Sequence, residues 1–120
     1  MKANTETING VTFTLEIEPE DLEIRGNALA SGDDAEDREA EDSIIAQLES
    51  GNLWAWCSVK VTATAGGVEG VDYLGGCSYR DTAEFIQPGG YYDDMKAEAL
   101  AELKVRLAEA SAAHVALEVA

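Results

Sequence analysis

Hydrophobic and polar residues alternate over residues 11–18. Alternation with a period of two is typical of a strand with one buried face, so this segment predicts a strand that Pro19 ends. The apolar positions, which we expect to face inward, are Val11, Phe13, Leu15 and Ile17. Residues 1–9 are polar, and we expect them to be frayed.

A longer alternating stretch from Leu53 to Ala65 predicts a second strand, and Gly66-Gly67 is a strong signal for a two-residue hairpin turn. The return strand is expected over about 68–79. One face of the second strand carries Leu53, Ala55, Cys57, Val59, Val61 and Ala63, and the other carries Trp54, Trp56, Ser58, Lys60, Thr62 and Thr64. The register stays open. A tight turn places Cys57 opposite Gly76, and a one-residue bulge places it opposite Cys77.

Two segments have helical character. The first is expected over about 33–50, with Ser31 or Asp33 as N-cap, acidic residues in the first turn and Gly51 as the stop. Its predicted core face is formed by Ile44, Ile45 and Leu48. The last helix is expected to start at Tyr91 or Tyr92 and to run to about 112. It carries a heptad-like seam of Leu100, Leu103, Leu107 and Ala110, which His114 and Leu117 continue.

The predicted order is therefore β-α-β-β-α. It indicates an α+β two-layer sandwich, a three-stranded antiparallel sheet with two helices on one face. The 120 residues fit a single domain, 1–120, in which residues 1–9 and about 113–120 are expected to fray. Residues 20–32 contain Gly26 and Gly32 and predict an ordered loop. That loop either presents a recognition surface or only caps the following helix through Asn27 and Ser31.

The charge is extreme, −16 for 120 residues, and residues 1–50 hold 14 acidic and three basic side chains. Such a surface repels nucleic acid and anionic membranes, so neither is expected as a direct partner. It favours a basic protein partner, divalent cations, or solubility alone.

Seven of the ten residues 33–42 are acidic. On a helix, residues four apart share a face, so Asp33, Asp37 and Glu41 are expected to form one carboxylate row. Such a row could compete with nucleic acid for a phosphate-binding cleft; the simpler interpretation is a solvated helix face. The candidate partner-binding carboxylates are Asp33, Asp34, Glu36, Asp37, Glu39, Glu41 and Asp42.

Trp54 and Trp56 complete the candidate partner-binding set. If both point away from the helices, they are exposed on a bare sheet face, where large aromatic side chains make good interface anchors. Alternatively, they cover the second layer of the sheet or the loop of residues 20–32.

No catalytic arrangement is apparent, and we expect the protein not to be an enzyme. Cys57 lies in mid-strand and His114 in the C-terminal tail, so a nucleophile–base pair is not expected, and both cysteines are interpreted as free thiols. Neither a phosphate-binding loop nor a calcium-loop motif follows from the spacing of residues, so no metal or cofactor is predicted. A leader peptide and a membrane-spanning run are not apparent, so the cytoplasm is the expected location.

Four segments together resemble a family of small uncharacterised proteins of bacteriophages and prophages. They are RGNALASGDD at 25–34, GNLWAWC at 51–57, DYLGGCSY at 72–79 and GGYYDDMKAEAL at 89–100. The resemblance carries over no catalytic or binding residue. It implies a phage or mobile-element product acting inside a bacterium, where small acidic proteins look like inhibitors of host defence, including anti-CRISPR and anti-restriction proteins.

Our leading hypothesis is thus a non-catalytic acidic protein that binds a basic host protein and inhibits defence by charge mimicry, in the case where that host protein itself binds nucleic acid. The alternative is a phage structural or assembly protein that self-associates as a homodimer through its C-terminal helix, using Leu100, Leu103 and Leu107. A small metal-dependent enzyme is a third reading.

Overall fold

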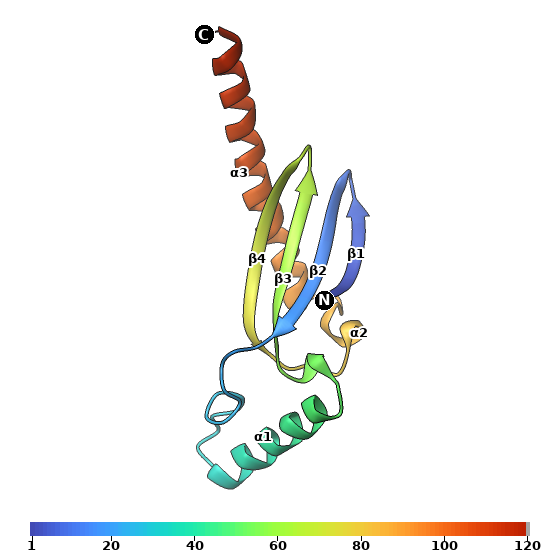
Figure 1. Ribbon diagram of the computed structural model, residues 1–120, viewed down its shortest axis with the longest axis vertical. Coiled ribbons are helices and arrows are strands. Elements are labelled where there is room, and N and C mark those ends of the chain that lie inside the picture. Colours follow the sequence, from blue (N-terminus) through green and yellow to red (C-terminus); the bar gives the residue numbers. More distant parts are fainter. Residues whose placement is uncertain (120) are drawn as a thin grey trace.

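The computed structural model describes residues 1–119, with side chains described as far as Ala113. It shows an α+β fold built on a four-stranded antiparallel sheet of order β1-β2-β3-β4 (Figure 1). The elements in chain order are β1 (Lys2–Ile8), β2 (Val11–Pro19), α1 (Asp34–Glu49), the 3-10 helix η1 (Leu53–Ala55), β3 (Cys57–Ala65), β4 (Val68–Cys77), the short α2 (Thr82–Phe85) and α3 (Tyr91–Val119).

The prediction of a three-stranded sheet with a frayed N-terminus is wrong, because residues 2–8 form β1 at the edge of the sheet. Asn9 and Gly10 make the connecting turn, with positive φ angles of 49° and 81°. An Asn-Gly pair with two positive φ angles suits the right-handed twist of adjacent strands, and it joins β1 to β2 as a tight hairpin.

The main core lies between the inner face of the sheet and α3. Phe13, Leu15 and Ile17 on β2 are buried there as predicted, together with Val59 and Val61 of β3. The α3 side chains in this core recur every three or four residues: Tyr92, Met95, Ala99 and Leu103. This spacing places them on one helical stripe.

Helix and sheet approach unusually closely at Gly70 of β4. A Cβ atom built on Gly70 would lie 2.2 Å from the carbonyl oxygen of Ala99 and 2.4 Å from the backbone nitrogen of Leu103. Only a residue without a side chain leaves room for the α3 backbone at this point.

The hairpin of β3 and β4 settles the open register in favour of the bulge. Cys57 pairs with Cys77, while two positions later Val59 pairs with Leu74, so β4 carries an extra residue between them. Gly76 takes a positive φ of 63° in the bulge, and its N–H donates to the Glu20 carboxylate at 2.9 Å.

Both cysteines are buried, and burial raises the pKa of the Cys57 thiol to about 12 and that of Cys77 to about 11. An unfolded thiol ionises at an ordinary pKa near 9.0, so above that pH the unfolded chain releases protons that the folded chain still holds. The contribution of the two thiols to the free energy of unfolding should therefore be constant below pH 9, and the stability should fall as the pH rises toward 11 to 12.

This alkaline loss can be measured as the thermal midpoint at pH 7.5, 9 and 10.5. The variant Cys57→Ala should show a shallower decline than the wild type, although it starts from a lower midpoint. Burial also raises the pKa values of Cys77 and Tyr79, which leaves a residual decline in the variant. If the thermal midpoint fell equally steeply with pH in both proteins, the alkaline loss would not come from the Cys57 thiol.

Residues 53–56 do not extend the strand, contrary to the sequence prediction. Leu53–Ala55 form η1 instead, capped by the Asn52 side chain, which accepts from the Trp54 N–H at 3.2 Å. Side chains therefore alternate between the two faces of the sheet only from Cys57 onward. Trp54 and Trp56 turn inward, and each is only 5% exposed.

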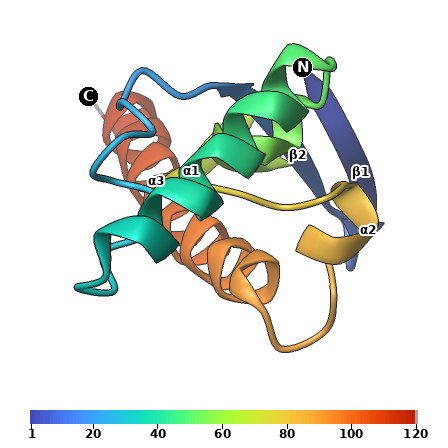
Figure 2. The ribbon, with the colours of Figure 1, turned by 90° about the horizontal axis from the view of Figure 1, so that it is seen from below.

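The expectation of two helices on one face of the sheet is also wrong. Only α3 covers the sheet, along β3 and β4, whereas α1 lies beyond its end and packs against η1 (Figures 1 and 2). The predicted core face of α1, Ile44, Ile45 and Leu48, is only partly buried and lies outside the main core. Its large apolar residues are confined to the last turns, so α1 has too little apolar surface to cover a sheet.

Helix α3 extends past the end of the sheet and so lengthens the molecule. The molecule measures 66 × 24 × 24 Å along its principal axes. Leu107 lies against the β3–β4 turn, 3.5 Å from the position of a Cβ on Gly66, and residues 108–113 are exposed. In the predicted seam, Leu103 is fully buried against the sheet, Leu100 and Leu107 partly so, and Ala110 is exposed. The side chains of His114 and Leu117 lie outside the described residues.

Candidate partner-binding surface

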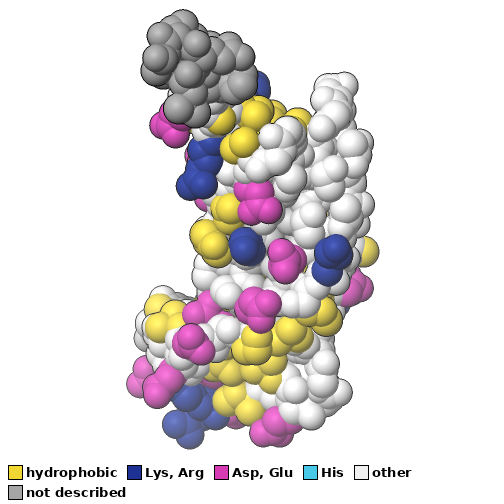
Figure 3. All heavy atoms as spheres, turned by 45° about the horizontal axis from the view of Figure 1, so that its top comes forward, with side chains coloured by type: hydrophobic (Ala, Val, Ile, Leu, Met, Phe, Trp, Pro, Cys, Tyr) yellow, Lys and Arg dark blue, Asp and Glu magenta, His cyan; other side chains and the backbone are white. Residues whose placement is uncertain are grey.

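Residues 20–50 form a distinct part of the structure, which we call the acidic lobe. It comprises the loop after β2 and helix α1, and it carries 11 acidic and two basic side chains. Figure 3 shows acidic side chains spread over the lower end of the molecule, which is the end that carries α1 in Figure 1. The lobe contains all seven carboxylates that the sequence nominates.

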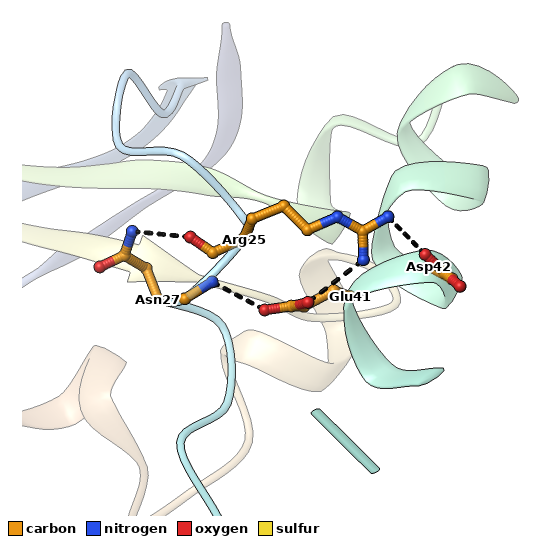
Figure 4. A network of polar contacts seen from close by, with 5 residues as sticks. Arg25, Asn27, Glu41 and Asp42 are labelled. Atoms are coloured by element: carbon orange, nitrogen blue, oxygen red, sulfur yellow. Dashed lines mark hydrogen bonds and ion pairs between the residues drawn. The ribbon is translucent and has the colours of Figure 1, made fainter. Parts of the chain in front are cut away.

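The lobe is held together by a clamp between its loop and α1 (Figure 4). Glu41, only 6% exposed, accepts from the Arg25 guanidinium at 3.1 Å and from the Gly26 N–H at 2.7 Å. Arg25 also pairs with Asp42. The side-chain hydrogen bonds to Asp42 and then Glu41 raise the pKa of Arg25 above its ordinary value. Glu41 and Asp42 therefore bind groups within the lobe, namely the Arg25 guanidinium and, for Glu41, also the Gly26 N–H.

Two more predicted carboxylates shape the start of α1. Asp33 is the N-cap, and its side chain accepts from the N–H groups of Ala35 and Glu36 at 3.0 and 3.2 Å. One oxygen of Asp37 accepts from both the N–H and the hydroxyl of Ser31, at 3.0 and 2.7 Å. The Asp33 bonds occupy helix-terminal donors that would otherwise lack partners, and the Asp37 bonds tie the loop to the helix.

In the predicted row, Asp37 and Glu41 are thus bonded to the loop, and Asp33 caps the helix itself. Of the seven nominated carboxylates, three are exposed on α1 and have no hydrogen bond to any described residue: Asp34, Glu36 and Glu39. Asp42 is 57% exposed even though it is paired with Arg25. The outward charge of the helix therefore rests on a smaller set than the sequence nominates.

Of the two interpretations of Trp54 and Trp56, exposure on a bare sheet face does not hold, because both side chains are buried. The centroid of the Trp54 ring lies 5.2 Å from that of Phe85, with the planes tilted by 32°, and 6.1 Å from that of Tyr79 in an edge-to-face arrangement. The indole N–H of Trp54 donates to the Thr82 hydroxyl at 3.0 Å. The turn into η1 carries it into this aromatic cluster. It consequently supports α2 rather than presenting an anchor to a partner.

Trp56 links the acidic lobe to the sheet. Its indole N–H donates to the carbonyl of Leu22 at 2.7 Å, and the ring lies against Gly76 of the β4 bulge. Glu20 bonds to the same bulge. This burial agrees with the alternative interpretation, in which Trp56 covers the loop of residues 20–32.

The remaining chemistry of the chain is sparse. Cys57 is fully buried in the core, and the His114 side chain lies outside the described residues. Within residues 1–113, no group of three or more His, Cys, Asp or Glu side chains is arranged to hold a metal ion. Across the described helices, none is long and apolar enough to pass through a bilayer.

Sequence reasoning missed the organising role of Arg25 and Glu20. Both act over 16 or more positions, Arg25 on Glu41 and Asp42 and Glu20 on Gly76, so no short-range spacing reveals them. The one available signal was the isolation of Arg25. It is one of only two basic residues in the most acidic part of the chain, and such a cation is expected to find internal partners.

Comparison with known proteins gives no further guidance, because no family model, curated protein or solved structure matches the chain.

Proposed function

We propose that the protein is a non-catalytic binding protein whose acidic lobe docks onto a basic surface of a host protein. If that surface normally holds DNA or RNA, docking inhibits it by competition. The observation that carries the proposal is that Asp34, Glu36 and Glu39 stay exposed on a helix that internal bonds hold in place. The phage context, and a defence system such as CRISPR or restriction as the target, rest on the sequence resemblance.

The geometry suits electrostatic recognition. The lobe lies at one end of a 66 Å long molecule, so it can enter a cleft that the sheet and α3 do not reach. The clamp fixes the helix before binding, which lowers the ordering cost of association. Charge attraction of this kind acts mainly on the association rate and weakens with salt.

The test compares two triple variants with equal charge change. The first, Asp34→Asn with Glu36→Gln and Glu39→Gln, removes the exposed lobe carboxylates and leaves the clamp intact. The second removes three exposed carboxylates outside the lobe, through Glu69→Gln, Glu98→Gln and Glu109→Gln. Each protein is used as bait in bacterial lysate at about 50 and 500 mM salt, a range over which screening changes strongly.

We expect a nucleic-acid-binding protein to be captured by the wild type and by the second variant, and to be released at high salt. The lobe variant should capture it about tenfold less well at low salt. Equal capture by the two variants would show that the position of the charge is irrelevant and would refute lobe-specific docking.

A second candidate function is self-association as an assembly protein through α3. It is favoured by the part of α3 that runs past the sheet, where residues 108–113 are exposed. Leu103 is unavailable for such pairing because it is fully buried in its own core. A mass that rises with protein concentration in sedimentation would support this role, and a monomer at all concentrations would refute it.

A further inference from the structure

An open apolar groove runs beside α3, far from the acidic lobe. Because α3 covers β3 and β4, the inner face of the β1–β2 hairpin is only partly covered. The groove between that hairpin and α3 has a volume of about 380 Å³. Its apolar walls are formed by Ile8, Val11 and Phe13 on the hairpin and by Ala97 and Leu100 on α3.

These walls leave apolar surface in contact with water. Ile8 is 45% exposed, and Val11 and Leu100 are only partly buried, whereas Phe13 forms a floor that is almost fully covered. Burying such surface under an apolar ligand is favourable because it removes apolar atoms from contact with water. A volume of this size is at the lower end for small-molecule sites, so it suits a single short chain rather than a bulky ring system.

The charged residues that line the groove are both cations, Lys96 and Lys104, in a chain with 24 acidic and only eight basic residues. The Lys96 ammonium is already neutralised by Glu6 at 2.7 Å, and it lies over the Tyr92 ring at 4.4 Å. Lys104 is exposed and has no ion-pair partner among the described residues. The two positions are eight residues apart, which is about 12 Å along a helix axis.

We propose that this groove binds a small anionic amphiphile, a single alkyl chain ending in a carboxylate. The chain lies along Phe13, Ala97 and Leu100, and the carboxylate pairs with the Lys104 ammonium. The apolar walls supply most of the affinity, and the exposed Lys104 ammonium selects a negatively charged head group. The proposal is independent of the acidic lobe.

The first experiment titrates the full chain with octanoate, decanoate and dodecanoate below their micelle concentrations, followed by calorimetry at about 150 mM salt. We expect saturable binding of one molecule for each chain. Affinity should rise about two- to fourfold for each added methylene, since a fully buried methylene contributes a factor of about four and this groove is half open. 1-Decanol, which has the same chain and no charge, should bind roughly three- to fivefold more weakly than decanoate, as is usual for an exposed ion pair.

Two variants locate the site. Ala97→Phe fills the groove from an exposed position outside the core and should weaken decanoate binding at least tenfold. Lys104→Gln should abolish the preference for decanoate over decanol and leave decanol binding unchanged. The matched control is Lys60→Gln on the opposite face of the sheet, which should bind as the wild type does. Circular dichroism confirms that each variant is folded.

Three results would overturn the proposal. The first is that no chain length binds saturably. The second is that decanoate and decanol bind equally to the wild type. The third is a mass that doubles with concentration and returns to the monomer in Ala97→Phe, which would show that a second copy occupies the groove.

Discussion

Replacing Gly70 by alanine is expected to displace α3 from the sheet and to cause the largest loss of stability of any single substitution considered for this fold. The new Cβ would lie 2.2 Å from the Ala99 carbonyl oxygen and 2.4 Å from the Leu103 backbone nitrogen. Both are helix backbone atoms, which cannot swing aside as a side chain does. We expect a cost of about 3–5 kcal/mol, above the usual range of roughly 1–3 kcal/mol for overpacking because the clash is with backbone atoms.

The effect is read as the thermal midpoint of unfolding, which should drop by roughly 10–20 °C. Gly75→Ala on the same strand is the matched control, since its nearest neighbour is the flexible end of Glu20 at 3.3 Å. The control should melt close to the wild type. If Gly70→Ala also melted within about 2 °C of the wild type, the close approach of α3 to β4 would be refuted.

The second large effect is expected at the clamp of the acidic lobe. Glu41→Ala removes the acceptor for both Arg25 and the Gly26 N–H, so the loop and α1 lose their main connection. The sheet and α3 make no use of this contact, and we therefore expect local opening rather than global unfolding. Arg25 is half exposed and recovers hydration, which limits the loss to about 2 kcal/mol.

Hydrogen exchange measured by mass spectrometry checks this result. Amides of residues 20–50 should exchange roughly 30-fold faster in Glu41→Ala, while peptides from the strands are unchanged. Glu39→Ala, an exposed glutamate on the same helix, serves as the control and should leave exchange unaltered. Uniform acceleration through the whole chain would show that the lobe and the sheet unfold as one unit.

The strands that face α3 could be predicted because burial imposes a period of two on Val11–Ile17 and on Cys57–Ala63. The edge strand β1 could not be found in this way. Its side chains face solvent on one side and the margin of the core on the other, so its sequence carries little hydrophobic contrast. Asn9-Gly10 was the available signal, and its turn geometry outweighs the polar composition of residues 2–8.

The two tryptophans show a different limit. Their alternation with Ala55 and Cys57 is compatible with a strand, but Asn52 caps a turn of 3-10 helix that rotates both rings inward. The side-chain cap and the partners of the two indole N–H groups outweigh the periodic pattern. None of these partners is near in sequence, since Thr82 and Leu22 are 28 and 34 positions away.

For the candidate site, the sequence located the acidic helix and gave Asp33 as one of two candidate N-caps, but it could not separate structural from exposed carboxylates. By composition alone, all of these carboxylates look alike. In the structure, Asp37 and Glu41 are bonded to the loop, whereas Glu36 and Glu39 face outward. The distinction depends on where Ser31 and Arg25 lie in space. Charge-removal experiments that include Asp37 or Glu41 would therefore disturb the lobe as well as its charge.

The strands on either side of the acidic lobe are direct neighbours, with Pro19 paired to Cys57 at the point where the chain leaves and re-enters the sheet. Adjacent antiparallel strands need only a short turn to connect them. The lobe is thus an insertion within a simple meander, and its length and charge can change without altering the strand order. Evolution or protein design could exchange the lobe for another recognition module while keeping the same scaffold.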